Sequence, residues 1–198
     1  MTSLLIIGAG GHGKVVADTA RSSGYDDISF LDDAWPEKLN NGSWQVRGRP
    51  AISDTPTFCA VGNNIARETI FTTFELSDAP VLAHPTTIVS PTSQIGNGTL
   101  LVAGAIVNAD ARIGRGVILN TACSIDHDCE IADFAHISPG ARLAGGVKVG
   151  RRSWIGIGAV VREGIHIGDD VVIGAGSVVV TNIENGAKVC GVPARTIR

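Results

Sequence analysis

The sequence predicts a small α/β domain at residues 1–83, followed by a parallel β-solenoid at residues 84–198. Two observations predict this fold class. One is a long column of branched apolar residues spaced six apart. The other is a glycine-rich turn between a strand-like and a helix-like segment near the N-terminus. Neither an α-helix nor an ordinary strand has a period of six, whereas a three-sided prism with six residues per side does.

The six-residue column predicts where the interior of the solenoid lies. Its sixteen members are Val89, Ile95, Leu101, Val107, Ile113, Leu119, Ile125, Ile131, Ile137, Leu143, Val149, Ile155, Val161, Ile167, Ile173 and Val179. Smaller residues, among them Ala105, Cys123 and Cys129, recur two positions before it and fit at corners. A single coil of this kind cannot bury its apolar side alone, so eighteen-residue coils must stack.

The residues that directly follow the column are predicted to form the corners. Glycine and asparagine suit corner backbone that needs positive φ. They are Gly96, Gly114, Gly150, Gly156, Gly168, Gly174, Asn108 and Asn120.

Alternating strand-like and helix-like segments precede the repeats. The pattern predicts strands at 3–7, 28–31, 58–61 and 80–82, and helices at 14–23 and 65–76. A loop rich in Pro, Gly and Asn fills residues 32–56. Such alternation is typical of an α/β domain with a parallel sheet.

Composition excludes several classes of function. The formal net charge of -3 gives no electrostatic reason to expect a nucleic-acid or membrane partner, and the apolar stretches fall far short of a bilayer span. No signal peptide is visible at the N-terminus. The four cysteines lack C-x-x-C spacing, and packing in the corner column explains Cys123 and Cys129. We therefore expect a cytoplasmic protein with reduced thiols.

Gly8, Gly10 and Gly13 form a G-x-G-x-x-G pattern after a strand and before a helix, and Asp32 follows about twenty residues later. Backbone amides at such a helix start hold diphosphates. Because a dinucleotide fold needs two halves and this unit is only one, we expect a site for one nucleotide or nucleotide-sugar. His12 within the turn favours a ligand over an empty turn. A dinucleotide-dependent oxidoreductase is the alternative.

The stretch Asp126-His127-Asp128 carries the strongest signal for chemistry. A neutral His127 could accept a proton from an amine or hydroxyl that attacks a thioester, and either aspartate could hold the ring tautomer. A solvated corner histidine is the alternative. His136 lies half a coil further on, so it faces a different side of the same subunit, although the two histidines could meet across a trimer interface.

No metal site is expected. Zinc enzymes of the gamma carbonic anhydrase kind need three convergent histidines. His127, His136 and His166 differ in their positions within the coil, so no two of them stack within one subunit.

The chain resembles the bacterial sugar O- and N-acetyltransferase family, which includes sialic acid O-acetyltransferases and bacillosamine-pathway N-acetyltransferases. The motifs that carry the resemblance are Ile6-Ile7-Gly8-Ala9-Gly10-Gly11-His12-Gly13-Lys14, Phe30-Leu31-Asp32-Asp33, Ala60-Val61-Gly62-Asn63-Asn64, Leu119-Asn120-Thr121, Asp126-His127-Asp128-Cys129, His136-Ile137-Ser138-Pro139-Gly140 and Gly191-Val192-Pro193-Ala194. The resemblance implies a Rossmann-like N-terminal domain, a left-handed parallel β-helix and a homotrimer with active sites between subunits.

The resemblance also implies roles for individual residues. His127 matches a general base, and Asp126 matches the acidic residue that orients it. The nucleotide-linked amino sugar would contact Gly10, Gly11, His12, Asp32, Asp33, Gly62 and Asn120. Acetyl-CoA, the co-substrate, would contact His136, Ile157 and Ala175.

The implied reaction is direct transfer of acetyl from acetyl-CoA to the 4-amino group of a UDP-linked 4-amino-4,6-dideoxy sugar. No cysteine is a candidate nucleophile. N-acetylation of GDP-perosamine, O-acetylation of sialic acid and transfer of another acyl group are alternatives within the class. A non-catalytic nucleotide-sugar scaffold, or a purely architectural solenoid, is an alternative from another class.

Overall fold

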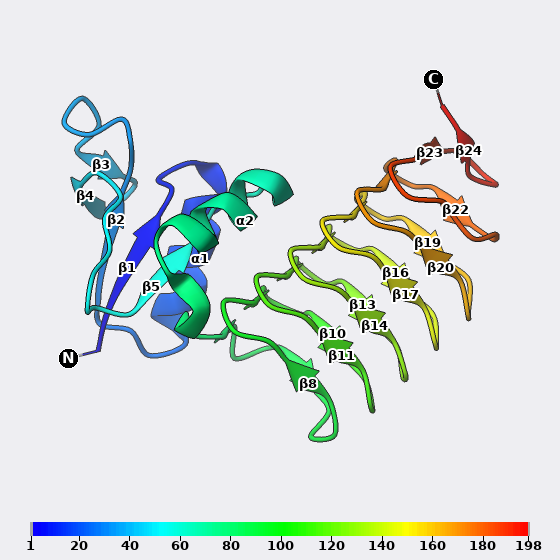
Figure 1. Cartoon of the computed structure of the whole chain (residues 1–198). Coiled ribbons are helices and arrows are strands. Elements are labelled where there is room, and N and C mark those ends of the chain that lie inside the picture. The colour runs from blue at the N-terminus through cyan, green and yellow to red at the C-terminus, as the bar shows by residue number, and fades with distance from the viewer. Residues whose placement is uncertain (1, 198) are drawn as a thin grey trace.

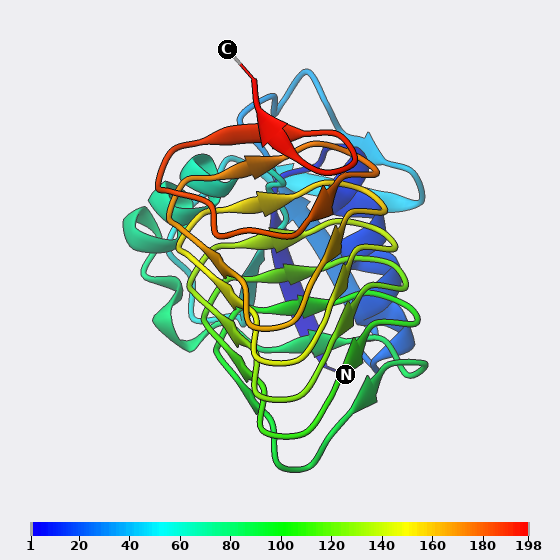
Figure 2. The same ribbon diagram turned by 90° about the vertical axis from the view of Figure 1, so that its right-hand side faces the viewer.

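The computed structural model describes residues 2–197, which form an α/β domain and a long solenoid (Figure 1). Viewed along the solenoid, the stacked coils have a triangular outline, with the α/β domain at the N-terminal end and along one side (Figure 2). The predicted order of an α/β domain followed by a parallel β-helix is therefore confirmed.

The α/β domain contains a five-stranded sheet of order β3-β4-β2-β1-β5. All neighbouring pairs are parallel except β3 with β4. Its strands are β1 (Ser3–Ile7), β2 (Asp27–Leu31), β3 (Asn40–Asn41), β4 (Trp44–Gly48) and β5 (Thr57–Cys59). Its helices are α1 (Gly11–Ser22), α2 (Asn64–Thr73) and the 3-10 helix η1 (Leu76–Asp78).

Two expectations for this domain are wrong. The predicted loop at 32–56 contains the hairpin of β3 and β4, which turns at Gly42 with a φ of 66° and buries Val46 beside Phe30. The strand expected at 80–82 is β6 (Leu82–Ala83), and it pairs with the solenoid instead of the α/β sheet. Short apolar runs do not reveal which sheet they join, because the apolar pattern is the same in both.

The solenoid has three parallel sheets, one on each side of the prism. The docking face is the sheet that the α/β domain covers at one end. It consists of β6 (Leu82–Ala83), β9 (Leu100–Leu101), β12 (Ile118–Leu119), β15 (His136–Ile137), β18 (Trp154–Ile155), β21 (Val172–Ile173), β23 (Lys188–Cys190) and the antiparallel β24 (Arg195–Thr196).

We name the other two sides the open face and the charged face. The open face consists of β7 (Ile88–Val89), β10 (Ile106–Val107), β13 (Ser124–Ile125), β16 (Arg142–Leu143), β19 (Val160–Val161) and β22 (Val178–Val179). The charged face consists of β8 (Gln94–Ile95), β11 (Arg112–Ile113), β14 (Glu130–Ile131), β17 (Lys148–Val149) and β20 (His166–Ile167).

The six-residue column forms the interior, as predicted. Fourteen of its sixteen members, Leu101 to Val179, are buried, and each strand pairs with the strand eighteen residues on, as Ile125 does with Leu143. Val89 is 38% exposed and Ile95 is partly exposed because they belong to the first coil, where the prism is open. Cys123 and Cys129 are buried corner residues, as expected from packing.

The expected reason for the corner glycines is wrong. The left-handed φ occurs three residues after the column, at Gly116 and Gly146 and also at Asp128 and Phe134. Gly114, which directly follows the column, has no such φ. A Cβ there would lie 2.7 Å from the Asp133 amide nitrogen of the next coil, so close stacking of the coils requires the glycine.

Arg67 of α2 joins the α/β domain to the solenoid. Its side chain is 1% exposed and donates to the Val61 and Gly62 carbonyls at 3.1 Å, to the Gly116 carbonyl at 2.7 Å and to the Phe134 carbonyl at 2.6 Å. Hydrogen bonds from a charged donor are stronger than neutral ones. Arg67 therefore fixes the loop after β5 against the coils that carry the docking face.

A second set of contacts supports this junction. Phe71 of α2 packs edge-to-face on Phe134, with ring centroids 5.3 Å apart. Glu68 pairs with Arg151 and with Arg152, the latter at 2.9 Å. An apolar contact and a shared carboxylate thus hold α2 on the corner between the charged and docking faces.

Within residues 2–197, no helix combines the length and the apolar character that a membrane crossing requires. Over the same range, no three side chains of His, Cys, Asp or Glu converge as ligands of a metal ion would.

Candidate active site

His127 lies at the corner between the open and charged faces, two residues after the buried Ile125. Its side chain is 62% exposed, and its Nδ1 lies 2.8 Å from Oδ2 of Asp128. Asp128 has a left-handed φ of 59°, which turns the chain back so that its carboxylate reaches the preceding ring. Since Nδ1–H donates to that carboxylate, Nε2 is left as a bare acceptor at the surface.

The two neighbouring carboxylates raise the pKa of His127. The hydrogen bond that Nδ1–H donates to Asp128 is the larger cause, and the charge of Asp126 is the second. Both favour the imidazolium over the neutral ring. An imidazole of raised basicity with a free Nε2 is suited to accept a proton.

Asp126 plays a different part in this structure. Its Oδ1 accepts from the backbone N–H of His127 at 2.8 Å and from Nδ2 of Asn108 at 3.0 Å. It therefore fixes the backbone and contributes charge, while the contact with the ring comes from Asp128. The orienting role expected for Asp126 stays a prediction.

His136, Asn120 and His12 meet where the docking face contacts the α/β domain. The His136 ring is stacked on Trp154, with centroids 5.4 Å apart and planes at 7°, and its centroid is 6.4 Å from that of His12. Asn120 Nδ2 lies 3.1 Å from His136 Nε2, while its Oδ1 accepts from the Thr121 amide. This pattern makes Nε2 the acceptor and assigns the ring hydrogen to Nδ1.

Two buried ring nitrogens in this cluster have no hydrogen-bond partner, Nδ1 of His136 and Nε2 of His12. Burial lowers the pKa of His12 to about 4 and that of His136 to about 3, and the charge of Arg67 adds to both shifts. Both rings are therefore neutral near pH 7. Neutral rings with unused nitrogens can bind polar groups of a ligand without adding charge.

The glycine-rich turn leads into α1 as predicted, with Gly10 at the N-cap position. Side chains built at Gly10, Gly11 or Gly62 would meet no atom within 4 Å, so these three residues border open space. At Gly13 a Cβ would lie 2.4 Å from the Gly8 carbonyl oxygen, so the turn packs too closely there for a side chain. The first amides of α1 are thus available to an anion.

The carboxylate of Asp32 accepts hydrogen bonds from backbone amides. Its Oδ2 accepts from the Ala9 amide at 2.6 Å and its Oδ1 accepts from the Ala34 amide at 3.0 Å. It therefore ties the glycine-rich turn to the end of β2. Asp33 is exposed, and both aspartates line a cavity of about 170 Å³ whose other walls include Ile70 of α2 and Phe74 directly after it.

Ile157 and Ala175 are exposed at the corner between the docking and open faces. They stack one coil apart, since the amide of Gly176 donates to the Ile157 carbonyl at 2.8 Å. This corner is the opposite edge of the open face from His127. One chain therefore does not bring Ile157 and Ala175 to His127. His136, in β15 of the docking face, also lies on a different side from His127, as expected.

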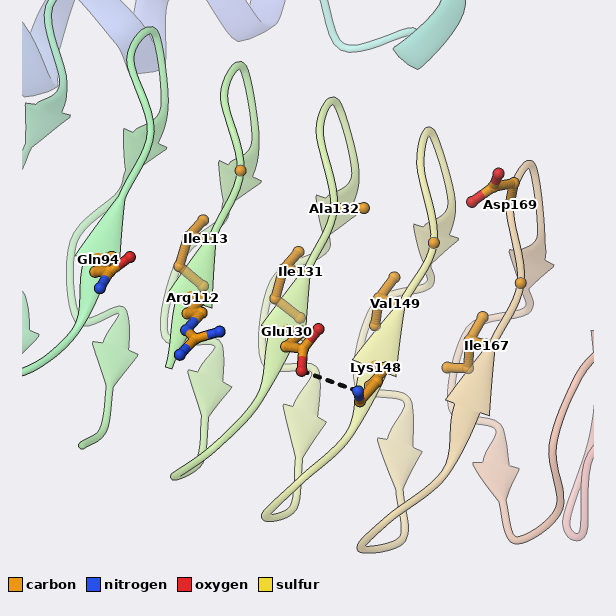
Figure 3. Close-up of a pocket in the computed structure, with 13 residues that line it drawn as sticks. Gln94, Arg112, Ile113, Glu130, Ile131, Ala132, Lys148, Val149, Ile167 and Asp169 are labelled. Carbon is orange, nitrogen blue, oxygen red and sulfur yellow. Dashed lines mark ion pairs between the residues drawn. The ribbon is translucent and has the colours of Figure 1, made fainter. Parts of the chain in front are cut away.

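The charged face holds a groove of about 410 Å³ that none of the expected site residues lines. Figure 3 shows a ladder of Gln94, Arg112, Glu130 and Lys148 along it, and Lys148 Nζ lies 2.9 Å from Glu130 Oε1. Alternating charges that pair across coils are typical of a solvated surface.

Sequence reasoning missed four residues of these sites. The sequence did not indicate a role for Arg67 or Trp154. An arginine in a helix and a tryptophan in a strand are common, and the contacts of both residues form only when parts of the chain that are distant in sequence pack together. Lys38 donates to the Ala9 carbonyl, and Asn41 donates to the Gly10 carbonyl at 3.1 Å. Both lie in the region read as a loop, so nothing indicated that they buttress the glycine-rich turn.

Comparisons with protein families match both parts of the chain. Residues 3–74 match the PglD N-terminal domain, and residues 146–181 match the bacterial transferase hexapeptide model of six repeats. A UDP-N-acetylbacillosamine N-acetyltransferase of Bacillus subtilis (strain 168) is 37% identical over 113 residues. That alignment spans 52% of this chain and 52% of the relative, so the chain matches about half of that protein's length.

Solved structures extend the similarity to the whole chain. The acetyltransferase domain of PglB from Neisseria gonorrhoeae FA1090, in complex with acetyl coenzyme A, is 40% identical, covers 99% of both chains and superposes with a TM-score of 0.93. PerB from Caulobacter crescentus, in complex with CoA and GDP-perosamine, is 32% identical with a TM-score of 0.90 and covers 99% of this chain and 97% of its own. The chain therefore belongs to the bacterial hexapeptide-repeat sugar N-acetyltransferase family.

Proposed function

We propose that this chain transfers an acetyl group from acetyl-CoA to the amino group of a nucleotide-linked amino sugar. The observation that carries the proposal is His127, an exposed imidazole of raised pKa whose Nδ1 is occupied by Asp128 and whose Nε2 is free. The acetyl-CoA complex of the PglB domain and the CoA and GDP-perosamine complex of PerB support it.

Within this class we propose a UDP-linked 4-amino-4,6-dideoxy sugar as acceptor. The name of the Bacillus subtilis relative, which is 37% identical over 113 residues, favours it over GDP-perosamine, whose acetyltransferase is 32% identical. The amides at the start of α1 would hold the diphosphate, and the cavity beside Asp33 would take part of the nucleoside. The neutral rings of His12 and His136 lie where the sugar would enter the solenoid.

The chemistry follows from the state of His127. The acceptor amine attacks the thioester carbonyl, and Nε2 of His127 removes the proton that the nitrogen must lose. Asp128 stabilises the imidazolium that forms, the C–S bond breaks as the new amide bond is made, and the imidazolium returns its proton to the departing sulfur of CoA. Cys123 and Cys129 are buried, so no cysteine of the solenoid interior is available to carry the acetyl group.

A homotrimer would complete this site. Four outward residues of the open face are apolar and at least partly exposed within residues 2–197; they are Ile88, Ile106, Val160 and Val178. If three copies turned their open faces toward a common axis, the His127 corner of one would meet the corner of Ile157 and Ala175 in the next. The acetyl donor bound along that corner would then lie beside the base.

The four cysteines are free, as expected for a protein that acts in the reducing cytoplasm, and we propose that location.

The first experiment is a thiol-release assay with acetyl-CoA and a panel of acceptors. The panel holds the UDP-4-amino-4,6-dideoxy sugar, GDP-perosamine and free sialic acid. Fast turnover of the UDP sugar supports the proposal, and turnover of another acceptor alone overturns the choice of sugar. His127→Ala should abolish turnover and leave acceptor binding intact.

Full activity of His127→Ala would eliminate the general-base role. If the wild-type protein released no thiol with any acceptor of the panel but still bound a nucleotide-sugar, the acetyltransferase proposal would be overturned in favour of a non-catalytic scaffold.

A further inference from the structure

Gly145 lies directly under the ring of His127. The two residues occupy the same position on successive coils, since they are eighteen apart, and the amide of Gly146 donates to the His127 carbonyl at 2.9 Å. A Cβ built on Gly145 would lie 2.5 Å from Cε1, 2.6 Å from Nε2 and 3.1 Å from Nδ1 of His127. The imidazole therefore occupies the space that a side chain at 145 would need.

The backbone does not explain this glycine. The left-handed φ of this corner falls on the next residue, Gly146, with a φ of 69°, and on its counterparts Asp110 and Asp128. Gly145 itself does not have such a φ. Residues with side chains, Ala109 and Glu163, fill the same position on other coils. Only at residue 145 does the ring of a histidine lie over the backbone.

Two groups thus restrain the ring. Asp128 holds its Nδ1 edge at 2.8 Å, and the bare backbone of Gly145 faces its Cε1–Nε2 edge. Neither restraint alone fixes the position of Nε2, because a hydrogen bond at one edge still allows the ring to swing about it. Together they allow the ring to lie over residue 145 at a corner that is otherwise open to solvent.

We infer that Gly145 is a positioning residue for His127: its missing side chain leaves the space in which the imidazole lies, and with Asp128 it sets where Nε2 points. The catalytic consequence of this inference rests on the proposed function, whereas the placement of the ring does not.

The size of the effect follows from contact distances. Carbon atoms in contact lie about 3.5–4.0 Å apart, so a Cβ 2.5 Å from Cε1 forces the ring to move by about 1 Å. Displacement of a reacting group by about 1 Å costs roughly 10²-fold in rate. Gly145→Ala should therefore lower kcat by roughly 10²-fold and change KM for either substrate by less than about twofold.

The matched control is Glu163→Ala, the same corner position one coil further on, where the Glu163 side chain is 74% exposed and contacts no ring. This variant should keep wild-type kcat, KM and Tm. Because Gly145 has no left-handed φ and a Cβ there would meet only the exposed ring of His127, Gly145→Ala should also keep the wild-type Tm.

A second readout separates ring placement from a general structural effect. In Gly145→Ala the displaced ring should lose part of its contact with Asp128, so the pKa of His127 measured by NMR should fall toward its ordinary value of 6.5. The acid limb of the kcat/KM profile should move to lower pH by the same amount. Glu163→Ala should show neither shift.

An unshifted His127 pKa in Gly145→Ala would overturn the inference, and so would wild-type kcat in Gly145→Ala once His127→Ala has been shown to be inactive. Failure of the proposed function has a separate signature. If His127→Ala is as active as the wild type, the general-base proposal fails, and the NMR titration of Gly145→Ala still decides whether residue 145 positions the ring.

Discussion

His12 and His136 come from different domains, yet their ring centroids lie 6.4 Å apart in one partly buried cluster. The first belongs to the start of α1 and the second to β15 of the docking face. Two imidazoles that are neutral near pH 7 thus lie between the start of α1 and the solenoid. If the proposed acceptor binds beside these rings, both domains would contribute to its pocket.

The first prediction concerns this histidine pair and acid stability. Both pKa values are lowered on folding, to about 4 and about 3, so between those values and 6.5 the unfolded chain binds more protons than the folded one. Stability must then rise with pH across that window, by roughly 1.4 kcal/mol per pH unit for each histidine. Urea denaturation from pH 4 to 7 measures this slope. His136→Asn should reduce it, and an unchanged slope would contradict the assigned cause.

The second prediction separates the two carboxylates beside His127. Asp128→Asn removes the partner of Nδ1, so the pKa of His127 should fall, the acid limb of kcat/KM should move to lower pH, and kcat should drop by at least about tenfold. Asp126→Asn keeps the contact with the ring and should shift the limb less. A larger shift in Asp126→Asn would restore Asp126 as the orienting residue.

The third prediction concerns association through the open face. Val160 is 43% exposed, and Val160→Glu would place a charge where a second copy is proposed to pack. Light scattering should report loss of the trimer, and kcat/KM should fall roughly 10²-fold because the site loses its second half. Gln94→Glu on the charged face is the control and should remain trimeric. A Val160→Glu protein that stays trimeric and active would exclude this face.

The fourth prediction concerns Arg67 as the link between domains. Arg67→Met leaves the buried carbonyls of Gly116 and Phe134 without their donor, which should cost on the order of 3–5 kcal/mol of unfolding free energy. Urea denaturation measures the loss. Arg162→Met, at an exposed arginine, should cost less than about 0.5 kcal/mol. Equal stability of the two variants would show that Arg67 does not hold the domains together.

The fold was largely predictable because most of the chain follows one periodic pattern, the six-residue apolar column. A six-residue apolar column admits few structures, and Leu101 to Val179 are buried as it requires. Less was predictable for the α/β domain. The hairpin of β3 and β4 depends on Val46 packing beside Phe30, a contact between segments whose local sequence is rich in loop formers.

The sequence predicted which residues belong to the candidate site better than it predicted which of them contact each other. Asp126 and Asp128 both flank His127, and local sequence cannot tell which one reaches the ring. That choice depends on the left-handed φ of Asp128 and on the stacking of Asn108 beneath Asp126. The role of Arg67 could not be predicted for a similar reason. The carbonyl groups that accept its hydrogen bonds belong to solenoid coils that approach Arg67 only when the domains pack together.

The eighteen-residue repeat separates the tasks of the three sides of the prism. In each two-residue strand one residue faces outward, so a change at Val160 would concern the proposed association, a change at Trp154 the contact with His136, and a change at Lys148 its ion pair with Glu130. Insertion of one whole coil ahead of Asp126 would carry His127 along the axis by one step without rotating it. Each inserted coil would lengthen the solenoid by the same amount without rotating its faces. The distance between the bound acceptor and the base could therefore be changed in steps of one coil.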